Sequence, residues 1–299
     1  MDPVAYDEFG LFAENAAEWD LTLATPPEVE RCSTSLDDGR QISSLRWGSA
    51  PSDLVLLHGG AQNAHTWDTT SLALNRDLLA IDLPGHGHSD GPRAGLDPTA
   101  MATDVAAAVE ALAAPPVVLV GMSLGGLTSL CLAADRPDLV RHLVLVDITP
   151  GVNKEKASHI TEFINGPAGF ESFDDLLERT VAFNPTRSVA SLRRGILHNA
   201  VQLEDGTWVW RWARHRDVTT EPIEAPEVRD LWDVVGSVPM PITLVRGMAV
   251  GSVVDQADVD ELRARRPDAA VIEVLDAGHS IQGDQPLLLA AELTRICAQ

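Results

Sequence analysis

Short apolar runs alternate with longer helical stretches over most of the chain, a rhythm typical of a sheet covered by helices on both faces. Two alternating runs come first. The turn residues Asp37, Asp38 and Gly39 separate them, so we expect a hairpin there. The later runs are compact and apolar, which predicts buried, mostly parallel strands. The predicted strands cover residues 29–35, 41–47, 54–57, 78–82, 117–120, 142–146, 242–245 and 271–275.

The stretches between these runs carry helix signals. Asp97 followed by Pro98 is a good N-cap and first-turn pair, and it predicts a helix that ends near Leu112. Further helices are predicted over residues 124–134 and 255–266, and a last one begins at Asp284 or Pro286.

One long segment breaks the alternation of strands and helices. Between Pro150 and about Val238 the pattern predicts only short helices and one hairpin, which turns at Asp205-Gly206. We interpret this segment as an insertion, since 299 residues suffice for one large α/β domain that carries one. The predicted parts are an N-terminal extension (1–28), a core (29–150 and 239–299) and an inserted cap (151–238).

The charge of the chain argues against polyanionic partners. With 44 acidic and 22 basic side chains, the formal net charge is −22, which repels phosphate backbones and anionic membranes. The first residues lack the basic and apolar regions of a secretory signal, and no window is apolar enough to span a membrane. We therefore expect a cytoplasmic monomer or homodimer that binds neither nucleic acid nor membrane.

The cysteines give no sign of a disulfide framework or a metal site. Cys32, Cys131 and Cys297 are odd in number, far apart, and without metal-type spacing. The chain also shows neither a dinucleotide fingerprint nor a phosphate-binding loop. No cofactor and no metal are expected.

The strongest chemical motif is Gly-Met-Ser-Leu-Gly-Gly at residues 121–126, between a predicted strand and a predicted helix. That context is typical of a nucleophile elbow, in which a serine occupies a strained turn and small neighbours let strand and helix approach closely. The helix N-terminus then directs its positive end at an oxyanion forming nearby. Ser123 is the candidate nucleophile.

Two further motifs follow predicted strands. After the strand at 54–57 comes His58-Gly59-Gly60, where backbone N–H groups can face a substrate oxygen. Gly60 and Leu124 are the candidate oxyanion donors, and His58 is expected to brace the loop. After the last strand, His279 can reach across the edge of the sheet to act as the base for the serine.

Taken in order, these motifs resemble the α/β-hydrolase superfamily from about residue 29 onward. The Asp-Leu-Pro-Gly-His-Gly-His-Ser loop at 82–89 lies at the expected place between the first two motifs. The resemblance implies an eight-stranded, mostly parallel sheet with helices on both faces, a mainly helical cap containing the hairpin, and a Ser–acid–His triad. It selects no substrate, because this fold hosts many reactions.

The acid of the triad departs from the usual pattern of the family. Members usually carry it on the loop after the strand at 242–245, where the spacing falls near Gly251 or Ser252, and neither is acidic. Other members place it at the end of the preceding strand, which here is Asp147. We favour Asp147, whose carboxylate could hold the imidazole tautomer, with Asp255 as the alternative.

The predicted hairpin carries tryptophans at alternate positions. Trp208, Trp210 and Trp212 share one face, where they either form an aromatic wall over an apolar substrate or attach the cap to the core. Trp67, after the oxyanion motif, is a second candidate pocket residue.

The serine at the elbow favours a small-molecule ester or lactone as substrate, cleaved through an acyl-serine intermediate. Dehalogenases and epoxide hydrolases of this fold use aspartate there, so both are disfavoured. A C–C bond hydrolase of a diketo acid is the alternative. A slow ligand-binding protein or a cofactor-free oxygenase on the same scaffold also stays open. A C–C bond hydrolase of this kind needs basic residues in its pocket to hold the substrate carboxylates. The candidates are Arg193, Arg194, Arg211 and Arg214.

Overall fold

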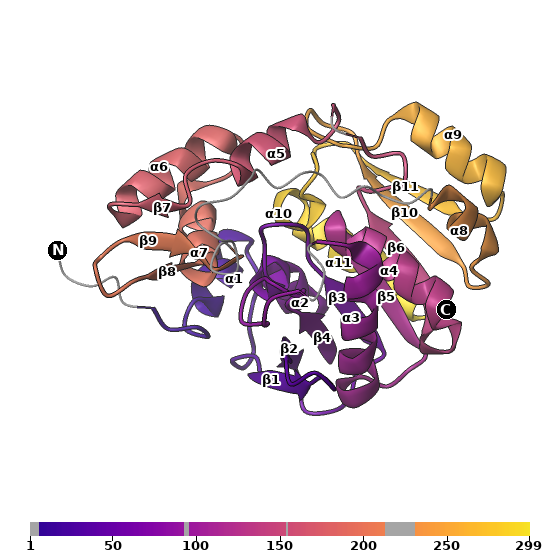
Figure 1. Cartoon of the computed structure of the whole chain (residues 1–299), viewed down its shortest axis with the longest axis horizontal. Coiled ribbons are helices and arrows are strands. Elements are labelled where there is room, and N and C mark those ends of the chain that lie inside the picture. Colours follow the sequence, from indigo (N-terminus) through magenta and orange to yellow (C-terminus); the bar gives the residue numbers. More distant parts are fainter. Residues whose placement is uncertain (1–5, 93–95, 154, 213–230) are drawn as a thin grey trace.

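The computed structural model describes residues 6–92, 96–153, 155–212 and 231–299. Its main sheet has eight strands in the order β1-β2-β4-β3-β5-β6-β10-β11 (Figure 1). The pairs β1–β2 and β2–β4 are antiparallel and all others are parallel. The strands are β1 (Val29–Ser35), β2 (Gln41–Trp47), β3 (Leu54–Leu57), β4 (Leu78–Ile81), β5 (Val117–Met122), β6 (Val140–Val146), β10 (Ile242–Gly247) and β11 (Ala270–Val274).

The eight predicted strands and the predicted fold class are thus confirmed. The first three strands have the predicted bounds, whereas β5 runs two residues further than predicted. There Gly121 and Met122 still pair with β6, so the strand continues to the residue before Ser123.

Helices cover both faces of the sheet, and alternate strand residues point to opposite layers. In β3, Val55 and Leu57 belong to one apolar core, and Leu54 and Leu56 to the other. The first core packs under α3 (Pro98–Leu112), α4 (Leu124–Asp135), α8 (Trp232–Ser237) and α9 (Gln256–Arg265). The second packs under α1 (Phe12–Glu18), α2 (Asp68–Leu74), α10 (Ile281–Asp284) and α11 (Pro286–Cys297).

Between β6 and α8, the elements from α5 to β9 form a layer of their own. Its strands make a second, antiparallel sheet in the order β7-β9-β8. The predicted turn is present, since Leu203 donates to the carbonyl of Thr207 at 2.8 Å and Gly206 has a φ of 91°. The elements are α5 (Ser158–Ile164), β7 (Gly169–Phe170), α6 (Phe173–Phe183), α7 (Val189–Asn199), β8 (Ala200–Gln202) and β9 (Trp208–Trp210).

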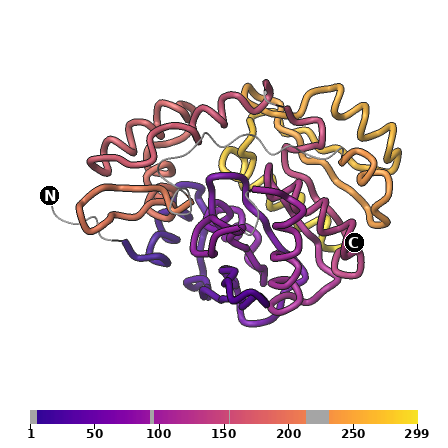
Figure 2. The backbone as a smooth tube through the Cα atoms, viewed as in Figure 1, coloured from indigo at the N-terminus to yellow at the C-terminus, as the bar shows by residue number. Residues whose placement is uncertain are grey.

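The N-terminal segment packs against both the main sheet and this inserted layer. Figures 1 and 2 show α1, in indigo, beside α7. On the core side, the ring of Phe12 lies 4.9 Å from that of Trp47. On the other side, Arg194 of α7 forms ion pairs with Glu14 and Glu18. The segment therefore ties the inserted layer to the core.

In the described part of the chain, no helix has both the length and the apolarity needed to cross a membrane.

The packing of α1 gives a stability prediction. Phe12→Ala removes a ring that is 5% exposed, and we expect it to lower the free energy of unfolding by about 3 kcal/mol. Urea denaturation measures this. The control, Leu275→Ala, truncates a side chain that is 75% exposed and should change the stability by less than about 0.5 kcal/mol. Equal small effects in both variants would show that α1 contributes little to the core.

Candidate active site

The candidate residues gather at the carboxyl ends of the parallel strands. Gly60 follows β3, Ser123 follows β5, Asp147 follows β6 and His279 lies on the loop after β11. Because the carboxyl ends of parallel strands meet at one edge of a sheet, residues far apart in the chain can form one site there.

Ser123 occupies the strained turn that the motif predicts. Its φ is 52° and its ψ is −121°, a backbone conformation that residues other than glycine rarely adopt. It is the N-cap residue of α4, and its N–H donates to the carbonyl of Val146. The strain lifts the side chain out of the path of both the strand and the helix.

Three glycines make this turn possible. A Cβ on Gly121 would lie 2.4 Å from the carbonyl oxygen of Gly125, and one on Gly125 would lie 2.4 Å from that of His58. A Cβ on Gly126 would meet Ile148 at 2.3 Å. Any side chain at these positions would separate β5, α4 and the loop after β3.

The two candidate oxyanion donors lie close together. A Cβ on Gly60 would be 4.0 Å from a methyl group of Leu124, the first residue of α4. The backbone N–H groups of Gly60 and Leu124 have no hydrogen-bond partner among the described residues. Both remain able to donate to a ligand.

His58 braces this loop, as its position in the motif predicts. Its Nδ1 lies 2.7 Å from the carbonyl oxygen of Gly59, and its Nε2 accepts from the N–H of Leu83 at 2.9 Å. The ring is fully buried, and burial lowers its pKa. Both ring nitrogens are engaged, which leaves none for proton transfer.

The structure brings Asp147 to His279. The Nδ1 of His279 lies 2.9 Å from Oδ2 of Asp147, a fully buried carboxylate. The same carboxylate accepts from the N–H groups of Gly247 and Val253 and from the hydroxyl of Ser252. Such a set of donors fixes the orientation of the carboxylate.

Asp255, the alternative acid, has a different place. It is the N-cap residue of α9 and forms a capping box with Asp258, and its carboxylate also pairs with Lys156 at 2.9 Å. No hydrogen bond or ion pair joins Asp255 to His279 in the described part of the chain. By contrast Ser252, near the usual acid position of the family, donates to Asp147.

The tryptophan predictions have mixed outcomes. Trp67 as a pocket residue is wrong, because the 3₁₀ turn Ala64–Trp67 directs the indole into the core, where it is fully buried. Trp208, Trp210 and Trp212 share one buried cluster with the inserted helices. Of the three, Trp210 also lines a cavity.

This cavity of about 170 Å³ lies between α7, α10 and the loop that follows β3 and carries Gly60, here called the oxyanion loop. Ala61 and Gln62, directly after Gly60, form one part of its wall, and Gln282, three residues after His279, forms another. Ser123 and His279 are not among the described residues that line it. The cavity therefore adjoins the residues after Gly60 and the helix that follows the His279 loop.

The basic residues proposed from the sequence are mostly engaged elsewhere. Arg193 is exposed and lies over the ring of Phe173. Arg194 lines the cavity but is paired with two glutamates, and Arg211 donates to the carbonyl of His198. Arg214 lies outside the described residues. Sequence reasoning missed Arg187, which also lines the cavity and has no motif around it.

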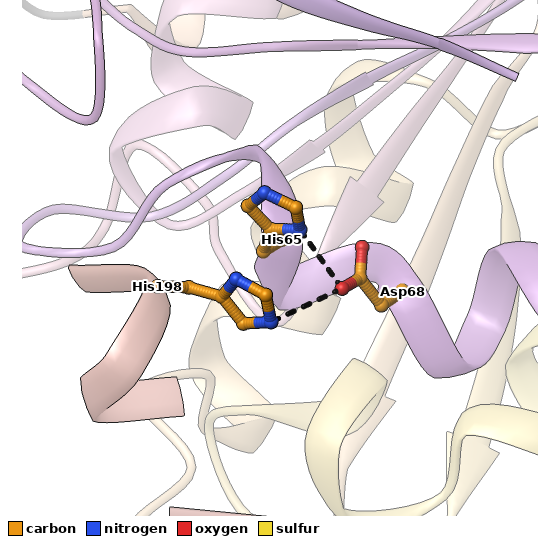
Figure 3. Close-up of side chains that lie close together, drawn as sticks. All are labelled: His65, Asp68 and His198. Carbon is orange, nitrogen blue, oxygen red and sulfur yellow. Dashed lines mark hydrogen bonds and ion pairs between the residues drawn. The ribbon is translucent and has the colours of Figure 1, made fainter. Parts of the chain in front are cut away.

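A buried cluster of His65, Asp68 and His198 was also missed (Figure 3). One ligand atom from each lies within 4.8 Å of the others. However, the two imidazoles stack with centroids 3.8 Å apart and planes only 12° apart. An ion in the plane of one ring would lie outside the plane of the other, so this arrangement does not fit a transition metal. Sequence spacing could not reveal the cluster, because His198 comes from the inserted segment.

The cluster is instead a charge network that reaches the N-terminal segment. Burial alone would lower the pKa of His65, but Asp68 and a hydrogen bond to Glu8 raise it to about 9. Burial and the neighbouring charge of His65 hold the pKa of His198 well below its usual range. At neutral pH the stack pairs one charged and one neutral ring.

Comparisons with known proteins agree with this fold. The sequence model of the "Alpha/beta hydrolase family" matches residues 54–292. Esterase Rv0045c of Mycobacterium tuberculosis is 42% identical over 291 residues, covering 95% of this chain and 93% of the esterase. A crystal structure of that esterase has a TM-score of 0.85 at 41% identity, with all of both chains covered.

A second relative is 2-(acetamidomethylene)succinate hydrolase of Mesorhizobium japonicum. It is 28% identical over 270 residues, covering 88% of this chain and 94% of the relative. A crystal structure of E-2-(acetamidomethylene)succinate hydrolase has a TM-score of 0.77 at 24% identity, covering 91% of this chain and all of the other.

The fold, with a serine on an elbow at the carboxyl edge of its sheet, defines an enzyme of the hydrolase class. The chain belongs to the alpha/beta hydrolase family, which confirms the resemblance found in the sequence.

The charge network predicts how stability depends on pH. The folded-state pKa of His65 exceeds its unfolded value of 6.5, so its contribution is complete below pH 6.5 and is lost as pH rises through about 9. We expect the free energy of unfolding to fall by on the order of 2–3 kcal/mol between pH 6.5 and 9.5. Urea denaturation at several pH values measures this loss. In His65→Gln this fall in the free energy of unfolding should largely disappear. If the free energy of unfolding of His65→Gln falls with pH as steeply as that of the wild type, other groups cause the loss.

Proposed function

We propose that this hydrolase cleaves a carboxylic ester, linear or cyclic as in a lactone, through an acyl-serine intermediate. The observation that carries the proposal is the contact between His279 and Asp147 at the edge of the sheet where Ser123 lies. The 42% identity to a protein named as an esterase supports the same bond type.

In this proposal Ser123 is the nucleophile and His279 is its base. The Nε2 atom of His279 is shielded from solvent and has no hydrogen-bond partner among the described residues, so it can accept the hydroxyl proton. Asp147 holds the proton on Nδ1 and stabilises the imidazolium. His279 then returns the proton to the leaving alcohol. Water, deprotonated by His279, attacks the acyl-serine and releases the carboxylic acid and Ser123.

Gly60 and Leu124 stabilise the developing oxyanion in this proposal. Their N–H groups have no partner among the described residues, and Leu124 lies at the N-terminus of α4, where the helix dipole favours negative charge. Donors fixed in advance need no reorganisation during the reaction. Such donors are each typically worth about 10²–10³ in rate.

The inserted segment acts as a cap. A Cβ on Gly60 would lie 3.9 Å from a methyl group of Ile164, at the end of α5, so this layer reaches the oxyanion loop. We propose residues 151–238 as the cap, 29–150 and 239–299 as the core, and 1–28 as the segment that joins them. The aromatic cluster around Trp210 then supplies the apolar side of the cap.

The proposal is tested by covalent labelling. A fluorophosphonate should label the wild-type protein at Ser123, because an activated serine attacks phosphorus as it attacks a carbonyl. Peptide mass spectrometry locates the label, and Ser123→Ala should remain unlabelled. Absence of labelling in a folded wild-type protein would contradict the proposal, and ligand binding and oxygen uptake would then test the two non-hydrolytic alternatives.

The role of the acid is tested by paired substitutions. Asp147→Asn should lower kcat for an ester substrate by about 10⁴, because an amide at this position no longer stabilises the imidazolium. Asp255→Asn should stay within about two-fold of wild type, since asparagine is also a good N-cap residue. Circular dichroism confirms folding of both variants. A larger loss in Asp255→Asn than in Asp147→Asn would overturn the assignment.

A further inference from the structure

The cavity beside the oxyanion loop differs in charge from the rest of the molecule. The chain carries twice as many acidic as basic side chains, yet the described residues that line this cavity include no aspartate or glutamate. Two arginines, two histidines and many amide and hydroxyl side chains form its wall. Such a lining favours an anionic ligand.

Arg187 is the unpaired cation of this lining. It forms no ion pair with any described residue, and its one side-chain hydrogen bond goes from Nη2 to the hydroxyl of Ser191. Its Nε is shielded from solvent and has no partner among the described residues. The guanidinium packs within 3.0 Å of the position that a Cβ would occupy on Gly283. Arg187 therefore lies against the helix that follows the His279 loop.

The nearest carboxylates are engaged elsewhere. Glu18 binds Arg194 and Ser188, and Asp284 accepts from the N–H of Gly278. Arg194 lines the same cavity and is paired with two glutamates, whereas Arg187 forms no ion pair with any described residue and is attracted by Asp284 and Glu18 only at longer range. A guanidinium cannot lose its proton in a protein, and an unpaired, desolvated charge is costly. A ligand carboxylate would remove that cost.

We propose that Arg187 binds a carboxylate of the substrate in this cavity, so that the enzyme prefers esters that bear a second, free carboxylate. The inference rests on the proposed esterase function and narrows its substrate class. The Nε and Nη1 groups of Arg187 are the donors that remain for such a ligand. Gln62 and Gln282, in the wall of the cavity, connect it to the oxyanion loop and to the His279 loop.

The test compares esters that differ only by the carboxylate. Monomethyl adipate and methyl hexanoate vary the acyl side, and 6-acetoxyhexanoate and hexyl acetate vary the alcohol side. For the charged member of one pair, Arg187→Gln should lower kcat/KM by roughly 10- to 100-fold, mainly through KM. The neutral members should stay within about two-fold. The responding pair shows which side of the ester enters the cavity.

Two further variants control for general effects. Arg193→Gln removes a charge from the exposed face of α7, the helix that begins two residues after Arg187, and should leave both pairs unchanged. Arg187→Lys keeps the charge and should recover part of the preference. The proposal is overturned if Arg187→Gln affects charged and neutral esters alike, or affects neither.

A direct binding measurement separates this inference from the esterase proposal. Adipate alone should raise the Tm of wild type and of Ser123→Ala but not of Arg187→Gln, since a ligand that binds only the folded state stabilises it. If the wild type hydrolyses none of the four esters but shows this shift, the esterase proposal fails and the carboxylate site stands. If adipate shifts no variant, the carboxylate site fails, whatever the activity.

Discussion

The site depends on how closely β5, α4 and the loop after β3 approach one another. A Cβ atom on Gly121 or Gly125 would lie only 2.4 Å from a backbone carbonyl oxygen, so the backbones at these two glycines are in direct contact with other backbone segments. This contact forces Ser123 into its left-handed conformation and brings Leu124 beside Gly60. One packing constraint thereby positions the candidate nucleophile and the candidate oxyanion donors, with no dependence on flexible side chains. A strain of about 1–3 kcal/mol at Ser123 persists because the surrounding core overdetermines it.

The acid shows how one geometry can be built from different strands. The loop after β10 has no carboxylate at the usual place, but it still contributes, since Ser252 and Val253 donate to Asp147. The two strands are neighbours in the sheet, so an acid at the end of β6 reaches the same His279 Nδ1. The left-handed φ of 46° at Asp147 turns its side chain toward that loop. A carboxylate therefore still reaches Nδ1 of His279, although it comes from the end of β6 and not from the loop after β10.

Local patterns predicted the strands and the elbow, because each follows from contiguous residues with a known geometry, whereas the candidate acid came from the resemblance to the family. The same patterns missed α1 and α2, which are only seven residues long and helical mainly through tertiary packing. They also misplaced Trp67, since the direction of a side chain after a 3₁₀ turn is set by the core. Arg187 and the His65–His198 stack could not be found, because their meaning depends on partners distant in the chain.

The distribution of carboxylates explains why Arg187, just before α7, and Arg194, within α7, behave differently. The N-terminal segment supplies Glu14 and Glu18 to Arg194, which fixes α7 against α1. Glu18 also accepts from Ser188, so its oxygens are occupied when Arg187 comes near. The chain has a net charge of −22, yet the described lining of this cavity contains two arginines and no acidic side chain. The contacts that hold α7 against α1 thus also occupy the carboxylates that could otherwise neutralise Arg187.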